Sequence, residues 1–203
     1  MPRTPRLPPQ AAALLACALI SFGLAEPAHA DPPGPLLDGR CDEYENLAAQ
    51  AHPLRPGITL YLHQDHDHVW LCYTVPAGSF GTLDLRLQSP LQPAALNLHV
   101  SAQLGDWPAG QAGPPSPEAA GWWNGIGWSA MPLRPRGFDR SQTPPLPRFE
   151  SSPGRELQLS KRRFGRGEWQ LRLHIQGLQN AQGEWGELQF PAADAEPLRY
   201  DSH

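Results

Sequence analysis

Residues 169–175 read WQLRLHI, and this stretch decides the class of fold. Its odd-numbered positions are apolar and the even-numbered positions between them are polar. Successive side chains of a β-strand point to opposite faces, so this pattern is typical of a strand with one buried face and one solvated face. Six further segments alternate in the same way: 58–63, 69–75, 83–88, 96–101, 156–160 and 187–190.

The rest of the sequence favours the same class of fold. Turn residues separate the alternating segments, and the best helical candidate is short, residues 42–51 with Asp42 as its N-cap. The chain has 25 prolines in 203 residues, which disfavours an all-helical protein or a coiled coil. We therefore expect an all-β protein, an antiparallel β-sandwich of immunoglobulin-like or jelly-roll-like type.

The first thirty residues have the three parts of a secretory signal peptide. Two arginines precede an apolar run at 11–25, and an A-x-A cleavage sequence ends at Ala30. The run is too short for a transmembrane helix, which needs about 20 apolar residues. We expect export to the periplasm or the medium after cleavage near Ala30. Lipidation at Cys17, which follows a loosely lipobox-like sequence, is the alternative.

Residues 31–203 then form a single domain with two cysteines, Cys41 and Cys72. Export places them in an oxidising compartment, so we expect a disulfide; two separate buried thiols are the alternative. The net charge of −4 gives no electrostatic footprint for nucleic acid. No segment after the signal peptide is apolar enough to span a membrane, and we expect no membrane span.

One long insertion, at about 105–154, interrupts the alternation. It is rich in proline and glycine and holds four of the seven tryptophans, which favours an ordered loop over a disordered one. Residues 128–131 are a candidate for one more strand within it. Flat aromatic rings beside polar groups suit sugars. The predicted ligand residues are Trp122, Trp123, Asn124, Trp128, Arg134 and Arg136. Alternatively, these tryptophans cap the core and pin the loop.

Residues 63–68 read HQDHDH and concentrate possible metal ligands. Zinc or copper would use the histidines, His63, His66 and His68. The segment also lies between two alternating stretches, where an Asp-rich β-hairpin turn is ordinary. We expect the turn, with no metal bound.

Three quoted stretches carry a resemblance to a known family. They are LDGRCDE at 37–43, GITLYL at 57–62 and QDHDHVWLCY at 64–73. In this order they resemble the opening of carbohydrate-binding module family 9-like domains, which belong with the DOMON-like sandwiches. The resemblance covers 36–88 and extends less clearly over 155–190. It implies a β-sandwich that binds sugars, often as an appendage of a secreted glycoside hydrolase.

We therefore expect an exported, non-catalytic module that binds carbohydrate or envelope glycan, with a link to glycan breakdown. No G-x-S-x-G or HExxH motif occurs, and nothing in the sequence pairs two carboxylates as acid and base, so no enzyme activity is expected. The basic run at 161–166 is either a solvated hairpin or a contact for an anionic glycan.

Two alternative functions stay open. Some DOMON-like sandwiches carry haem and transfer electrons; here the axial ligands would be Met131 with His99 or His174. A structural envelope protein without a small ligand is the other alternative. No cofactor is expected, although some members of the family bind calcium. The carboxylates available for calcium, Asp38, Asp42 and Glu43, are explained equally well by capping and turn roles.

Overall fold

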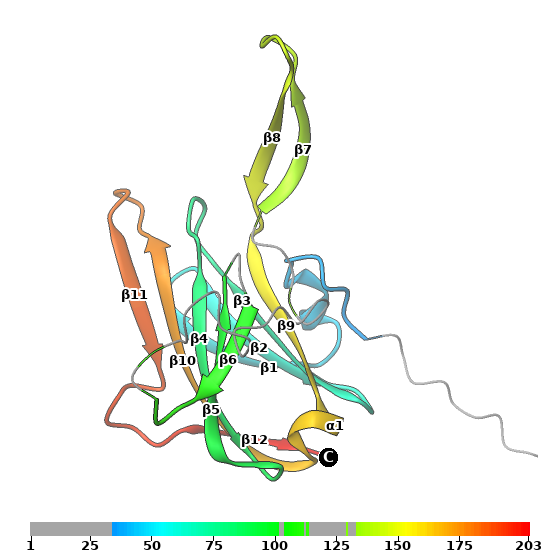
Figure 1. Ribbon diagram of the computed structural model, residues 1–203, viewed down its shortest axis with the longest axis vertical. Helices are drawn as coiled ribbons and strands as arrows, with labels where there is room; N and C mark the ends of the chain where they lie inside the picture. Colours follow the sequence, from blue (N-terminus) through cyan, green and yellow to red (C-terminus); the bar gives the residue numbers. More distant parts are fainter. Residues whose placement is uncertain (1–33, 102–103, 112, 114–128, 130–132) are drawn as a thin grey trace, which may run out of the picture. The chain divides into compact units, whose positions relative to one another are not determined.

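A computed structural model shows how the chain folds (Figure 1). It describes residues 34–101, 104–111, 113, 129 and 133–203. The predicted signal peptide lies outside these residues, and Asp31–His203 forms one compact unit. The described part consists mainly of antiparallel strands arranged in two sheets that enclose one core. The predicted all-β sandwich is confirmed.

Sheet A has four strands in the order β1, β2, β3, β9: Gln50–Arg55, Ile58–Gln64, His68–Thr74 and Gly154–Ser160. Sheet B has the order β11, β10, β4, β5, β6: Trp185–Phe190, Gly167–Gln179, Thr82–Ser89, Gln92–Val100 and Leu104–Pro108. A short strand, β12 (Leu198–Ser202), pairs with the first half of β10. All seven segments predicted from alternation are strands.

The core lies between the inward faces of the two sheets. Leu60 and Leu71 of sheet A and Leu85 and Leu171 of sheet B are fully buried in it. Each such leucine contributes roughly 1.5–3 kcal/mol of burial free energy. Trp169 is also fully buried, and its indole Nε1 donates a hydrogen bond to the carbonyl oxygen of Gly165 at 2.8 Å. The polar residues of each alternating segment therefore face outward.

The helix predicted at 42–51 is wrong beyond its first turn. A 3₁₀ helix, η1, covers Asp42–Glu45, and Asp42 is its first residue rather than its cap. Ala48 has a φ of +51°, which turns the chain toward β1. The β1 strand then begins at Gln50, where the sequence analysis expected helix.

The long insertion also contains strands that alternation did not predict. Besides β6, it holds β7 (Leu133–Asp139) and β8 (Leu146–Ser151), which pair as a separate hairpin. Figure 1 shows this hairpin standing apart from the strands of both larger sheets. Prolines and a register shift interrupt the alternation of β7 and β8. Of the strand expected at 128–131, Ser129 forms an isolated bridge to Leu157, and the other three residues lie outside the described residues.

The basic run at 161–166 is not a solvated hairpin. It begins with a single helical turn, α1 (Lys161–Phe164), in which Lys161 and Phe164 are buried. The Lys161 ammonium donates to Gln64 Oε1 at 2.8 Å and to the carbonyl oxygens of Asp65 at 2.7 Å and His203 at 2.5 Å. This lysine therefore fastens α1 to the end of β2 and to the chain beyond β12.

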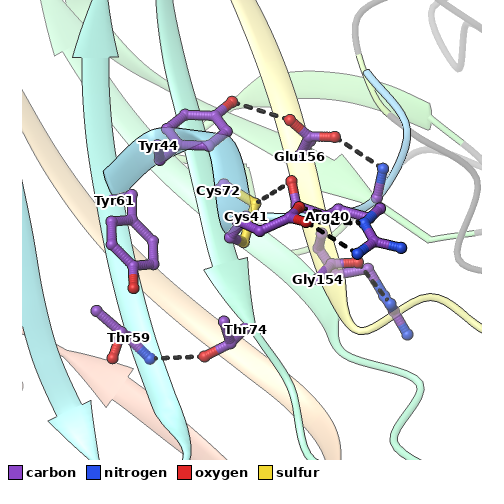
Figure 2. The surroundings of a disulfide bond; sticks show 12 residues. Arg40, Cys41, Tyr44, Thr59, Tyr61, Cys72, Thr74, Gly154 and Glu156 are labelled. Carbon is purple, nitrogen blue, oxygen red and sulfur yellow. Dashed lines mark hydrogen bonds and ion pairs between the residues drawn. A yellow bond between two sulfur atoms is a disulfide. The ribbon is translucent and has the colours of Figure 1, made fainter. Parts of the chain in front are cut away.

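A disulfide fastens the N-terminal segment to the outer face of sheet A (Figure 2). Cys41 Sγ and Cys72 Sγ are 2.01 Å apart, so the predicted pairing is confirmed. Cys72 lies in β3 on the face opposite the core, where it packs with Tyr44 and Trp70 in a second, smaller cluster. Closing a loop of this length stabilises the fold by roughly 3–4 kcal/mol in the chain-entropy account.

A buried carboxylate, Glu156 of β9, completes this attachment. It accepts hydrogen bonds from the backbone N–H groups of Asp38 at 2.8 Å and Gly39 at 2.7 Å, and from the Tyr44 hydroxyl at 3.0 Å (Figure 2). Gly39 has a φ of +78°, and a Cβ there would lie 2.7 Å from Ser152 Cβ. The LDG sequence at 37–39 therefore forms a tight turn over Glu156.

This arrangement predicts a specific pH dependence of stability. Burial raises the pKa of Glu156 to about 7, from an ordinary value of 4.5. Between these pH values the folded protein holds a proton that the unfolded chain releases, so the unfolding free energy falls as pH rises through this window. The expected loss is roughly 3 kcal/mol, and it should be complete by about pH 8.

Glu156→Gln is the matched variant, because it keeps the oxygen acceptor and the shape but does not titrate. Denaturant unfolding at pH 4.5 and pH 8 should show a smaller loss of stability in the variant than in the parent protein. An identical loss in both proteins would show that Glu156 is not the group responsible.

Candidate functional site

The outer face of sheet B carries the candidate site, because its outward side chains form ordered rows. In the first row the strand register places Arg172 of β10 opposite Arg86 of β4, Arg86 opposite Asn97 of β5, and Asn97 opposite Trp107 of β6. Directly opposed residues in an antiparallel pair have Cβ atoms about 4.5–5.5 Å apart. Two guanidinium groups, an amide and an indole, each from a different strand, therefore form one continuous row across the sheet.

A second row runs beside the first. It places His174 of β10 opposite Asp84 of β4, and Asp84 opposite His99 of β5. Members of both rows line a cavity of about 610 Å³. Its other lining includes Gln88, Gln189 and the loop after β11. This volume lies within the range of about 300–1,000 Å³ that is usual for small-ligand sites.

The amides of this cavity have unused hydrogen-bonding capacity. Within the described residues, the side chains of Gln88, Asn97 and Gln189 have no hydrogen-bond partner. Each primary amide can donate twice and accept twice. The indole of Trp107 is 7% exposed and contributes apolar surface next to Asn97. The cavity thus combines polar groups that can pair with a ligand and one aromatic ring.

A chain of hydrogen bonds crosses the second row. Asp84 Oδ1 lies 2.7 Å from His99 Nδ1, and His99 Nε2 lies 2.9 Å from the Ser101 hydroxyl oxygen. Asp84 Oδ2 also accepts from the amide of Gln176 at 3.3 Å. A carboxylate that orients an imidazole, which in turn contacts a hydroxyl, is the arrangement that activates serine nucleophiles.

The sequence analysis missed this constellation because no G-x-S-x-G motif marks it. His99 and Ser101 are two positions apart at the end of an alternating segment, so they share a face. The sequence alone therefore indicated that these two side chains lie next to each other. The partner Asp84 lies on another strand, however, and only the register of β4 against β5 brings it to His99.

The histidines proposed as haem ligands are both engaged in this network. His174 contacts Glu187 Oε2 through Nε2 at 3.0 Å and the Gln176 amide through Nδ1 at 3.2 Å. Both ring nitrogens of His99 are likewise hydrogen-bonded. Ligation of haem iron by either histidine would break one of these bonds. Met131, the proposed second ligand, lies outside the described residues.

A second cavity, of about 530 Å³, lies where the β1–β2, β3–β4 and β10–β11 connections meet. Trp185 lines it, is 55% exposed and stacks on Phe80 with ring centroids 5.1 Å apart. The side-chain amides in its wall are already bonded: Gln179 donates to Gly183 O at 3.1 Å and Asn180 to Glu184 Oε2 at 2.8 Å. The cavity on sheet B therefore offers a ligand more free polar groups.

The ligand residues predicted from the long insertion are only partly described. Trp122, Trp123, Asn124 and Trp128 lie outside the described residues. Arg134 and Arg136 both lie on β7, and both pair with Glu150, at 3.4 Å and 2.9 Å. Neither arginine lines the cavity on sheet B.

The histidine-rich segment forms the predicted turn between β2 and β3. Asp65 holds it together, because its carboxylate accepts from the backbone N–H groups of Asp67 at 2.8 Å and His68 at 2.7 Å, and from Trp70 Nε1 at 2.7 Å. His66 pairs with Asp67, while His63 remains on β2. In the described part of the chain, no group of three or more His, Cys, Asp and Glu side chains is placed to hold a metal ion.

The carboxylates considered for calcium have local partners. Asp42 forms an ion pair with Arg40 at 2.8 Å. Asp38 Oδ1 accepts from the backbone N–H of Arg40 at 2.9 Å, and Glu43 Oε1 accepts from that of Leu36 at 3.0 Å. These contacts match the capping and turn roles that the sequence analysis kept as the alternative.

Comparisons of the chain with protein-family models, curated proteins and solved structures found no match. A separate search of the described residues for a helix of the length and apolarity needed to cross a bilayer also found none.

Proposed function

We propose that this protein is an exported, non-catalytic module that binds a carbohydrate or cell-envelope glycan on the outer face of sheet B. One observation carries the proposal. A cavity of about 610 Å³ is lined by two registered rows of side chains, in which an indole lies beside amides, a carboxylate, an imidazole and guanidinium groups.

Sugar chemistry matches this lining. A sugar ring carries many hydroxyl groups, each of which donates and accepts hydrogen bonds, and it presents apolar C–H groups between them. The amides of Gln88, Asn97 and Gln189, which have no partner within the described residues, can pair with the hydroxyl groups, and the Trp107 ring can pack against the C–H groups. The sheet fixes the backbone positions from which these side chains project, which lowers the entropic cost of binding.

Three further observations support the proposal. The N-terminal thirty residues have the form of a signal peptide, and the Cys41–Cys72 disulfide suits an oxidising compartment. The segment 36–88 resembles carbohydrate-binding module family 9-like domains.

Removing the free amides should weaken glycan binding without unfolding the protein. Asn97→Ala and Gln88→Ala should each reduce the affinity about fivefold, since a net hydrogen bond contributes about 1 kcal/mol. A glycan array with the purified protein would first identify a ligand. Titration calorimetry would then compare the variants with the parent protein.

Trp185→Ala, which alters the second cavity, is the matched control and should leave the affinity unchanged. If Trp185→Ala abolishes binding while the two amide variants bind normally, the site lies in the second cavity. If a broad glycan array gives no ligand at all, the proposed function is wrong.

The Ser101–His99–Asp84 chain favours a second candidate function, hydrolysis of an ester. Of these three residues only Asp84 lines the sheet-B cavity, so this reaction is a candidate separate from glycan binding there. The Ser101 oxygen would attack the acyl carbon while its proton passes to His99 Nε2 and then to the departing alkoxide. Water would next cleave the acyl-serine, releasing the carboxylic acid and restoring the hydroxyl group. Asp84 would orient the imidazole throughout.

A fluorophosphonate probe tests this candidate directly, because it labels only activated serine hydroxyl groups. Mass spectrometry should find the label on Ser101 in the parent protein and a strongly reduced rate in His99→Gln. Ser101→Ala is the control for labelling elsewhere. If Ser101 is not labelled, this candidate is wrong, and the three residues have a structural role in joining β4 and β5.

A further inference from the structure

Two arginines that are direct cross-strand partners lie in the wall of the sheet-B cavity. Arg86 of β4 and Arg172 of β10 are direct partners in an antiparallel register, and both line the cavity. Like charges placed directly opposite one another destabilise a sheet. A lysine-poor, acidic chain with a net charge of −4 has many other places for its arginines, so this pairing needs an explanation.

Among the described residues, no carboxylate forms an ion pair with Arg86 or Arg172. Arg172 donates through Nη1 to the carbonyl oxygen of Ala192 at 3.2 Å and through Nη2 to that of Ala195, and both acceptors are uncharged. For Arg86 the described residues supply neither a hydrogen bond nor an ion pair. The nearby carboxylate of Asp84 is held by His99 and Gln176.

Arginines elsewhere in the described chain differ in how they are compensated, and Arg155 and Arg166, for example, donate to backbone carbonyl oxygens. Six of them pair with a carboxylate: Arg40, Arg134, Arg136, Arg148, Arg163 and Arg199. The pair on sheet B is set apart by its direct cross-strand register in the wall of the cavity that also holds the amides and the indole. Its uncompensated charge therefore belongs to the binding surface.

The two guanidinium groups differ in how firmly they are held. The loop between β11 and β12 supplies both carbonyl acceptors of Arg172, so this side chain is fixed before a ligand binds. Arg86 is exposed and free to adjust. A fixed cation beside an adjustable one can receive an oxyanion with little loss of conformational freedom.

We propose that the sheet-B cavity selects glycans that carry an oxyanion, which Arg86 and Arg172 bind together. The inference rests on the proposed glycan-binding function and names its substrate class. A sugar carboxylate and a sulfate ester share the planar or forked oxygen arrangement that guanidinium groups recognise through paired hydrogen bonds. Asn97 and Trp107, next in the same row, would contact the adjoining sugar ring.

The test compares one glycan with and without its charge. An array that contains uronate, sulfated and neutral glycans identifies the best ligand. Its carboxyl-reduced or desulfated form then serves as the neutral counterpart. The parent protein should bind the charged form at least about tenfold more tightly, as expected for charge-assisted hydrogen bonds. Whether carboxyl reduction or desulfation removes the affinity distinguishes a uronate from a sulfate ester.

Arg86→Gln should lose this preference while binding the neutral form as the parent protein does. Arg86→Lys should recover part of the preference, because it restores charge without the forked geometry. Arg199→Gln, on β12 and outside the cavity, is the control and should change nothing. Unliganded Arg86→Gln should melt no lower than the parent protein, because it removes a like-charge contact.

The outcomes separate this inference from the function on which it rests. If the best ligand is neutral, and Asn97→Ala weakens it while Arg86→Gln does not, the protein binds glycans at this site but the anionic preference is wrong. If no glycan binds, both proposals are wrong.

Discussion

The close packing of leucine and aromatic side chains between the two sheets is the constraint on which the rest of the structure depends. A strand that slipped by one residue would move its whole apolar set from the core to water, so burial fixes the register. Leu85 pairs with Leu173 across β4 and β10 for this reason. Once the inward side chains are fixed, the strand positions from which the outward side chains project are fixed as well. The rows on sheet B are thus a by-product of core packing.

The outer faces of the two sheets differ in what lies against them. Sheet A is covered by the N-terminal segment, which the disulfide and the Glu156 carboxylate hold against it. Sheet B instead uses residues of its two polar rows to line a cavity. The family resemblance falls mostly on the covered side, because its opening motif forms the turn over Glu156. Its residues therefore explain how the sandwich is assembled, whereas the ligand-binding surface proposed here lies on the other sheet.

Sequence reasoning recovered the fold well and the candidate site poorly, and both results have physical causes. Period-two alternation reports which face a side chain takes, and all seven segments that it marked are strands. It missed β1, where Pro53 and a bulge interrupt the pattern, and the exposed β7–β8 hairpin, which has no core to face. It also missed β6 and β12, which are only five residues long. Cys41 and Cys72 were predictable as a pair because the chain after the predicted signal peptide holds only two cysteines. Arg86 and Arg172 were not, since alternation places each on a face without revealing which strand lies beside it.

The attachment of α1 has a practical meaning for anyone who handles the protein. Lys161 is the only lysine of the chain, and it is 4% exposed and surrounded by three oxygen acceptors. Burial also lowers the pKa of its amine. The folded protein therefore offers succinimide dyes and amine-coupled sensor chips no accessible lysine. Labelling of Lys161 by a dye therefore requires the junction of β2, α1 and the chain end to open. The extent of labelling at this one amino group measures local unfolding there.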